Sequence, residues 1–274
     1  RHGRPEKEID MSDDILDLGG RVALVTGAGQ GIGQQIALHL AGHGSGGVAV
    51  NDYHLERAEA VAEEIRASGG KAIAVQADVT DLAAVKAMVE KVQAALGPVG
   101  VLVNNAGNLG ATPTEDARKP FWETGPDAWN QAIGVNLYGV LNCTAAVTPG
   151  MIARKAPGRI ITIVSDAGRN GEPGLEAYSA AKAGAAGFMR AVARALARFE
   201  ITANAVSIST VRTAINEAQF QDAALVKRVF EKYIVRRPGT PDDVANMVLF
   251  LASNASPWIS GQTYAVNGGF TVSL

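Results

Sequence analysis

Residues 22–33 have the sequence Val-Ala-Leu-Val-Thr-Gly-Ala-Gly-Gln-Gly-Ile-Gly, a short apolar run that leads into a glycine-rich turn. A stretch with helical periodicity, 31–42, follows at once. Glycines let the backbone turn tightly and approach a pyrophosphate, and the free amides at the start of a helix attract its negative charge. The turn is therefore predicted to bind a dinucleotide through Gly27, Gln30, Gly31, Ile32 and Gly33. Position 32 breaks the general G-x-G-x-x-G pattern, so a plain glycine-rich turn stays an alternative.

The rest of the chain repeats this alternation of short apolar runs and longer helical stretches. Strands are predicted at 22–26, 47–52, 72–77, 99–104, 159–165, 202–206 and 263–266, and helices at 31–42, 55–68, 82–96, 127–153 and 176–199. Such alternation is typical of a Rossmann-type, doubly wound parallel sheet, here of about seven strands with helices on both faces. Residues 1–13 are polar and aperiodic and are expected to be a flexible tail or tag remnant, which leaves 14–274 as a single dinucleotide-binding domain.

Composition and charge exclude several classes of protein. The formal net charge is -2 and the basic residues are scattered, which argues against a nucleic-acid partner. No apolar run has the roughly 18 to 20 residues of a membrane span, and no secretory signal is evident, so a cytoplasmic protein is expected. The single cysteine, Cys143, lies in an apolar stretch and is expected to be a buried thiol. The four histidines have no metal-ligand spacing, so no metal is expected.

Carboxylates end the second and third predicted strands, where a ligand of such a sheet would lie. Asp52 comes 25 residues after Gly27, and a carboxylate there can accept both ribose hydroxyls of an adenosine and would repel a 2′-phosphate. NAD is therefore favoured over NADP, although His54 and Arg57 are close enough in sequence to weaken that preference. Asp52 could also be a plain helix cap.

After the third strand, Asp78 is placed to meet the adenine amino group. Asp81, three residues later, could equally cap the helix that follows.

Several motifs, in the same order along the chain, resemble those of the short-chain dehydrogenase/reductase family. They are Thr-Gly-x-x-x-Gly-x-Gly at 26–33, Asn-Asn-Ala-Gly at 104–107, Val-Asn-Leu at 135–137, Ser165 with Tyr178-x-x-x-Lys182, and the closing segments 259–262 and 266–269. The resemblance covers the chain from about Gly20 to its C-terminus. It implies further cofactor contacts at Asp78, Val79, Asn105, Ala106, Gly107, Tyr178, Lys182, Val211 and Thr213.

The chemistry of the Ser, Tyr and Lys set agrees with that resemblance. Tyr178 and Lys182 are four residues apart on a predicted helix, so they share one face. A neighbouring ammonium is expected to lower the pKa of the phenol, which then exchanges a proton with the substrate oxygen while hydride moves between carbon and nicotinamide. Ser165 would hold that oxygen. By the family pattern, Asn136 would hold a water that passes protons to Lys182.

Two stretches depart from the family pattern. The usual Pro-Gly pair after the sixth strand is replaced by Ile208-Ser209, while Thr213 is kept. The loop is therefore expected to follow a different path, with Val211 and Thr213 still in reach of the cofactor. The stretch 108–125 looks longer than in compact members and is either a wall of the substrate site or a surface loop.

Farther along, the segment 209–237, which we call the lid segment, has apolar residues at roughly helical spacing and is expected to cover the substrate. Thr240 and Pro241 are expected to start a helix as its cap and first residue.

Taken together, the sequence predicts an NAD(H)-dependent oxidoreductase that interconverts a secondary alcohol and a ketone, with Asn136, Ser165, Tyr178 and Lys182 as its catalytic residues. Two alternatives stay open: an NADP-dependent 3-oxoacyl-thioester reductase and a non-catalytic nucleotide-binding scaffold of the same fold. The substrate is expected to be a small, partly apolar molecule. The resemblance also implies a homotetramer or dimer.

Overall fold

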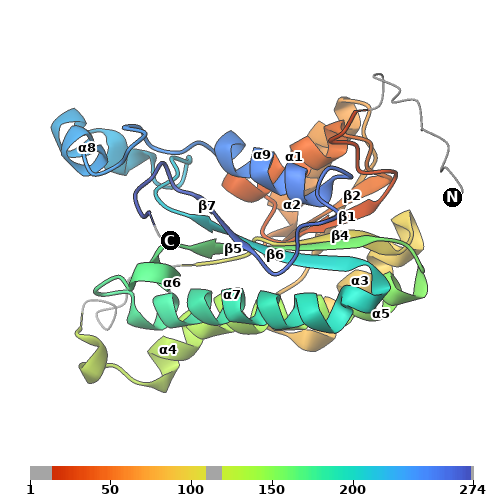
Figure 1. Cartoon of the computed structure of the whole chain (residues 1–274), viewed down its shortest axis with the longest axis horizontal. Coiled ribbons are helices and arrows are strands. Elements are labelled where there is room, and N and C mark those ends of the chain that lie inside the picture. The colour runs from red at the N-terminus through yellow and green to blue at the C-terminus, as the bar shows by residue number, and fades with distance from the viewer. Residues whose placement is uncertain (1–13, 109–118, 273–274) are drawn as a thin grey trace, which may run out of the picture.

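Seven parallel strands form one sheet in the order β3-β2-β1-β4-β5-β6-β7, seen nearly edge-on in the computed structural model, which describes residues 14–108 and 119–272 (Figure 1). The strands are β1 (Val22–Val25), β2 (Gly47–Asp52), β3 (Ala72–Gln76), β4 (Val99–Asn104), β5 (Gly158–Ser165), β6 (Ile201–Ile208) and β7 (Thr263–Val266). This arrangement confirms the predicted Rossmann-type fold. The order reverses between β1 and β4, because the chain leaves these two neighbours toward opposite edges of the sheet.

Helices cover both faces of the sheet (Figure 1). One layer consists of α1 (Gly31–Gly42), α2 (Leu55–Ala67) and α9 (Pro241–Ala252), and the other of α3 (Leu82–Leu96), α5 (Gly139–Ala153) and α7 (Glu176–Leu196). The shorter helices α4 (Pro126–Ile133), α6 (Ala167–Asn170) and α8 (Ala223–Phe230) lie toward the carboxyl edge of the sheet.

Two hydrophobic cores result from this layering. Successive strand residues point to opposite faces, so in β1 Ala23 and Val25 enter one core and Leu24 enters the other. Both faces are covered by helices, and for that reason the strands are almost continuously apolar in sequence.

The helix predicted at 127–153 is interrupted in the structure. It consists of α4, a π-helical turn at Gly134–Tyr138, and α5. At the start of α5, a Cβ on Gly139 would lie 2.7 Å from Cγ2 of Val79, so the chain passes unusually close to the end of β3 here. Such turns often mark functional sites, and Asn136 lies inside this one.

Other expectations differ only at element ends or fall outside the described residues. The helix predicted at 176–199 ends as α7 at Leu196, followed by a 3-10 turn at Ala197–Phe199. In the lid segment, a 3-10 turn at Glu217–Phe220 precedes α8. The predicted tail 1–13 and most of the long stretch 108–125 lie outside the described residues.

The start of α9 confirms the predicted cap. The Thr240 hydroxyl accepts a hydrogen bond from the Asp243 amide, and the Asp243 carboxylate accepts one from the Thr240 amide at 2.7 Å. Arg237 also donates to this carboxylate, and its hydrogen bonds hold the pKa of Asp243 well below its usual range.

We expect Thr240→Ala to lower the free energy of unfolding by about 1 kcal/mol, because the first turn of α9 loses its side-chain acceptor. Thr240→Ser keeps the hydroxyl and is the control. Chemical denaturation measures both, and equal stability of the two variants would show that the cap is dispensable.

Candidate active site

A cavity of about 1110 Å³ opens at the carboxyl ends of the central strands. That volume exceeds the roughly 300 to 1,000 Å³ of a site for one drug-sized ligand, so a dinucleotide and a small substrate fit together. Every predicted cofactor contact except Lys182 lines it: Gly27, Gln30, Gly31, Ile32, Gly33, Asp52, Asp78, Val79, Asn105, Ala106, Gly107, Tyr178, Val211 and Thr213. Ser165 lines it as well, whereas Asn136 and Lys182 are buried behind its wall.

The glycine turn is shaped for close approach of a ligand. Gly27 and Gly31 have φ values of +60° and +59°, which favour glycine. A Cβ on Gly33 would overlap the carbonyl of Gly27 and the side-chain amide of Asn105. Gln30, at the N-cap of α1, makes no side-chain cap, so the first amides of this helix stay available to a pyrophosphate.

Hydrogen bonds from the end of β4 hold the glycine turn in place. The Asn105 side chain donates to the carbonyls of Thr26 and Gly27 at 3.0 and 2.9 Å. In return, the Thr26 hydroxyl accepts from the amides of Asn105 and Ala106, each at 3.1 Å. Contacts within the protein therefore fix the shape of the glycine turn.

Asp52 also supports the glycine turn. Its carboxylate is 7% exposed and accepts from the Gly29 amide and the His54 amide, each at 3.0 Å. His54 occupies the N-cap of α2 without a side-chain cap, and Asp52 is not the capping residue of that helix. Arg57 lines the same part of the cavity.

The two acidic residues after β3 have different environments. Asp81 caps α3 by accepting from the amides of Ala83 and Ala84. One oxygen of Asp78 accepts from the Thr80 amide and hydroxyl, each at 2.8 Å, and Asp78 lines the cavity.

Ser165 and Tyr178 meet beside the glycine turn. Ser165 ends β5 and Tyr178 lies in α7. Both side chains line the cavity, and Ser165 is close enough to Tyr178 to affect the pKa of its phenol. Lys182 lies one turn farther along α7, with its Nζ 5.8 Å from the centroid of the Tyr178 ring. The Nζ donates to the Ile163 carbonyl at 3.0 Å. The structure thus brings the predicted trio together, although no direct bond joins the amine to the phenol.

Burial controls the two proton affinities. It raises the pKa of Tyr178, and the hydrogen bond with Ser165 partly offsets the rise. It lowers the pKa of Lys182 to about 8. The expectation that Lys182 lowers the pKa of Tyr178 is therefore wrong for this structure, since the cost of burying a phenolate outweighs a charge that lies beyond hydrogen-bonding distance.

Asn136 lies behind the trio, in the π-helical turn. Its Nδ2 donates to the carbonyls of Ala132 and Asn108, each at 2.8 Å, while its buried Oδ1 has no partner among the described residues. A Cβ on Gly107 would lie 3.0 Å from that Oδ1 and 3.3 Å from the Lys182 Nζ, so both groups border the backbone at Gly107.

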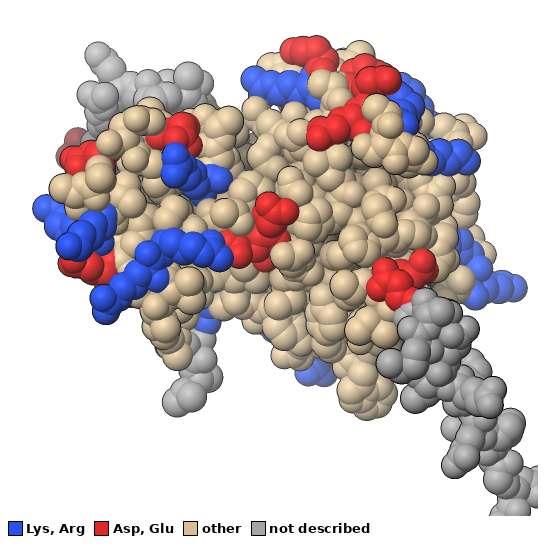
Figure 2. Space-filling view, turned by 90° about the horizontal axis from the view of Figure 1, so that it is seen from above, with Lys and Arg blue, Asp and Glu red and all other residues tan. Residues whose placement is uncertain are grey.

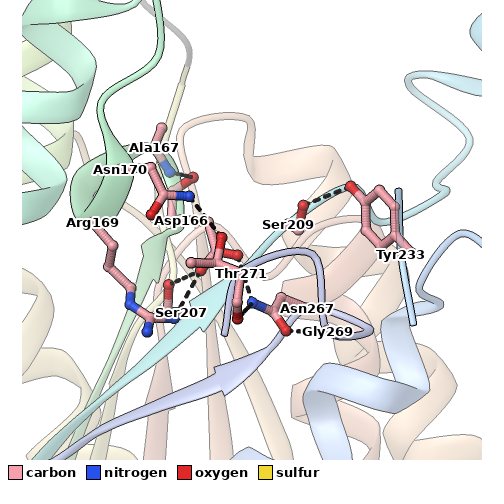
Figure 3. Close-up of polar contacts among 11 residues, drawn as sticks. Asp166, Ala167, Arg169, Asn170, Ser207, Ser209, Tyr233, Asn267, Gly269 and Thr271 are labelled. Atoms are coloured by element: carbon pink, nitrogen blue, oxygen red, sulfur yellow. Dashed lines mark hydrogen bonds and ion pairs between the residues drawn. The ribbon is translucent and has the colours of Figure 1, made fainter. Parts of the chain in front are cut away.

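Sequence reasoning missed a carboxylate next to Ser165. Asp166 is buried and accepts from the Ser207 hydroxyl at 2.8 Å and from the Asn267 side chain at 2.6 Å, while Arg169 pairs with it (Figure 3). It therefore joins the end of β5 to β6 and to the segment after β7. The only sequence signal was its place at a strand end, because its partners lie far along the chain.

The departure at Ile208-Ser209 has a structural role that glycine could not have. The Ser209 hydroxyl hydrogen-bonds the Tyr233 hydroxyl at 2.7 Å (Figure 3). The Tyr233 ring lies 4.8 Å from the rings of both Phe230 and Phe270. Val211 and Thr213 still line the cavity, so the altered turn connects the lid segment to the sheet without removing them from the site.

Comparison with known proteins agrees with this geometry. A family model described as enoyl-(acyl carrier protein) reductase matches residues 27–271. The chain belongs to the short-chain dehydrogenase/reductase family. It is an oxidoreductase that acts on CH–OH groups, and a nicotinamide dinucleotide is the cofactor expected.

Three proteins with different named activities are similar to this short-chain dehydrogenase/reductase. The 3-oxoacyl-(acyl-carrier-protein) reductase FabG of Staphylococcus epidermidis is 42% identical over 90% of the chain and 97% of its own length. The acetoacetyl-CoA reductase of Shinella zoogloeoides is 39% identical over 91% and 98%. A gluconate 5-dehydrogenase from Burkholderia cenocepacia J2315, solved in complex with NADP and tartrate, is 34% identical over 95% and 99%, with a TM-score of 0.86.

Within the described residues, no helix is long and apolar enough to span a membrane. The same residues contain no group of three or more His, Cys, Asp or Glu side chains that could hold a metal ion.

We expect Gly33→Ala to weaken cofactor binding at least about tenfold, or about 1.4 kcal/mol, because the new methyl group displaces the Gly27 carbonyl and the Asn105 amide. Gly42→Ala, at the other end of α1, is the matched control, since its Cβ would meet no atom within 4 Å. Fluorescence titration with reduced cofactor compares the two, and equal affinities would contradict the proposed crowding.

Proposed function

We propose that the chain interconverts a 3-oxoacyl thioester and the corresponding 3-hydroxyacyl thioester. The observation that carries the redox chemistry is that Ser165 and Tyr178 both line the dinucleotide-sized cavity, with the Lys182 Nζ 5.8 Å from the centroid of the Tyr178 ring. The thioester class is supported by the names of the FabG and acetoacetyl-CoA reductase relatives, which the chain matches along nearly their whole length. It is narrower than the secondary alcohol or ketone expected from the sequence.

In the proposed reduction, Tyr178 donates its proton to the ketone oxygen. Its raised pKa keeps the phenol protonated at neutral pH, as a general acid requires. Ser165 hydrogen-bonds the same oxygen and holds it beside the phenol. The nicotinamide, when bound, supplies the hydride in reduction and accepts it in oxidation.

Lys182 and Asn136 are proposed to resupply the proton. With a pKa of about 8, Lys182 exchanges protons readily near neutral pH. The Oδ1 of Asn136, which has no partner among the described residues, is suited to accept from a water that links it to the Lys182 Nζ across Gly107. This role agrees with the interrupted helix, which places Asn136 behind the site.

We propose NAD(H) as the preferred cofactor. The Asp52 carboxylate is nearly buried at the end of β2, beside the glycine turn, where it would accept ribose hydroxyls and repel a 2′-phosphate. The NADP bound by the gluconate 5-dehydrogenase favours the opposite preference. Arg57, which lines the same part of the cavity, is the cation that a 2′-phosphate would use.

We also propose a homo-oligomer, a dimer or tetramer, in the cytoplasm. Large apolar side chains near the C-terminus are exposed, among them Trp258 at 97% and Val272 at 75%. Such exposure supports burial against further copies of the chain.

The substrate proposal predicts that acetoacetyl-CoA is reduced with consumption of NADH, followed at the absorbance of the reduced cofactor. Tyr178→Phe should lower kcat by about 10² to 10⁴, because the proton donor is lost, while cofactor affinity stays unchanged. Turnover of simple ketones but not of the thioester would contradict this proposal and favour the broader prediction of an alcohol-ketone oxidoreductase. Near-normal turnover by Tyr178→Phe would remove Tyr178 from its role.

The cofactor proposal predicts that NADH binds at least about tenfold tighter than NADPH, because the Asp52 carboxylate repels the extra phosphate. Asp52→Asn keeps one acceptor oxygen but removes the charge. It should therefore reduce the ratio of NADH affinity to NADPH affinity, mainly by improving NADPH binding. Titration with each cofactor measures the ratio. A wild-type preference for NADPH would overturn this proposal without affecting the role of Tyr178.

A further inference from the structure

Three arginines gather at the amino edge of the sheet, opposite the active-site cavity. Arg21 immediately precedes β1, Arg159 is the second residue of β5, and Arg154 follows α5 as its C-cap. Arg21 is 8% exposed and Arg159 is 3% exposed. Buried guanidinium groups are unfavourable unless an anion or a full set of acceptors surrounds them.

Gly100 in β4 allows these side chains to come close together. A Cβ at Gly100 would lie 2.8 Å from Nη1 of Arg154 and 3.0 Å from both Cβ and Cγ of Arg21. The next residue of β4, Val101, pairs with Arg159 in β5. Burial, together with the positive charges of Arg159 and Arg154, lowers the pKa of Arg21 to about 10.

The hydrogen-bond partners of these arginines are neutral. Arg21 donates to the Asn254 side-chain oxygen and to the Ala252 carbonyl, each at 3.0 Å. Arg159 donates to the Gly158 carbonyl at 3.0 Å and to the Ser253 carbonyl at 3.4 Å. Arg154 donates to the Pro157 carbonyl at 3.3 Å.

Carboxylates do not balance this charge within the described part of the chain. None of the three arginines forms an ion pair there. Asp17 raises the pKa of Arg21, but its carboxylate accepts a hydrogen bond from the Gly19 amide. The buried Nε of Arg21 and Nη1 of Arg154 have no acceptor among the described residues.

We propose that Arg21, Arg154 and Arg159 form a binding site for a small, multiply charged oxyanion of the size of phosphate. Guanidinium groups donate in a planar fork that matches the oxygens of such an anion. The anion would supply acceptors to the Arg21 Nε and the Arg154 Nη1, which have none in the described part of the chain. Asn254, which accepts from Arg21, is itself exposed, as are Gly19 and Gly20 just before Arg21. The site is separate from the phosphate-binding turn and independent of the proposed substrate.

The test is thermal unfolding in phosphate and in chloride at equal ionic strength, with the cofactor site saturated by NADH or NADPH. Saturation prevents phosphate from acting at the glycine turn. We expect phosphate to raise Tm by about 2 to 4 °C through binding to the folded state. Arg154→Gln should reduce this shift, because it removes one of the three charges. If the unsubstituted protein has the same Tm in phosphate and in chloride, the proposed anion site is wrong.

Asn254→Asp provides an internal substitute for the anion. A carboxylate at the position that already accepts from Arg21 should raise Tm in chloride and abolish the extra rise in phosphate. Asn130→Asp on α4, also exposed and remote from the cluster, is the matched control and should keep the full response to phosphate. A full response in Asn254→Asp would show that phosphate acts elsewhere and would overturn the assignment.

Discussion

The hydrogen bonds between Thr26 and Asn105 fasten the carboxyl end of β1 to that of β4. The active-site cavity depends on this connection, because the chain leaves the two strands toward opposite edges of the sheet and would otherwise have little to hold the crevice in shape. The glycine turn follows β1. The backbone at Gly107, which Asn136 and Lys182 border, follows β4. The proposed cofactor site and the proposed proton path thus depend on the same hydrogen bonds.

Burial gives the proposed chemistry its direction. The phenol of Tyr178 favours its protonated form because a buried phenolate is unstable, and the amine of Lys182 loses its proton more easily for the same reason. A proton donor next to a group that exchanges protons near neutral pH is suited to reduction. The interaction with Ser165 partly offsets the rise in the pKa of Tyr178.

Much of the fold could be predicted because buried parallel strands have a simple pattern: β2, β4 and β7 have the bounds expected from their apolar runs. The interruption at Gly134–Tyr138 could not be predicted, because it involves close packing of Gly139 against Val79, sixty residues earlier in the chain. In the site, motif spacing correctly predicted that Ser165, Tyr178 and Lys182 lie near one another. The expected lowering of the pKa of Tyr178 was wrong, because burial raises it. The Asp166 and Asn267 contact was missed because residues so distant in sequence carry no shared local pattern.

Ser209 and the aromatic rings around Tyr233 hold part of the lid segment against β6 and against Phe270 through contacts within the protein. A wall assembled in advance has already lost its conformational freedom during folding. A molecule that enters the cavity therefore loses less binding free energy to ordering of the protein. More of that free energy remains to distinguish a well-fitting molecule from a poor one. The replacement of the customary Pro-Gly pair thus favours selectivity over adaptability.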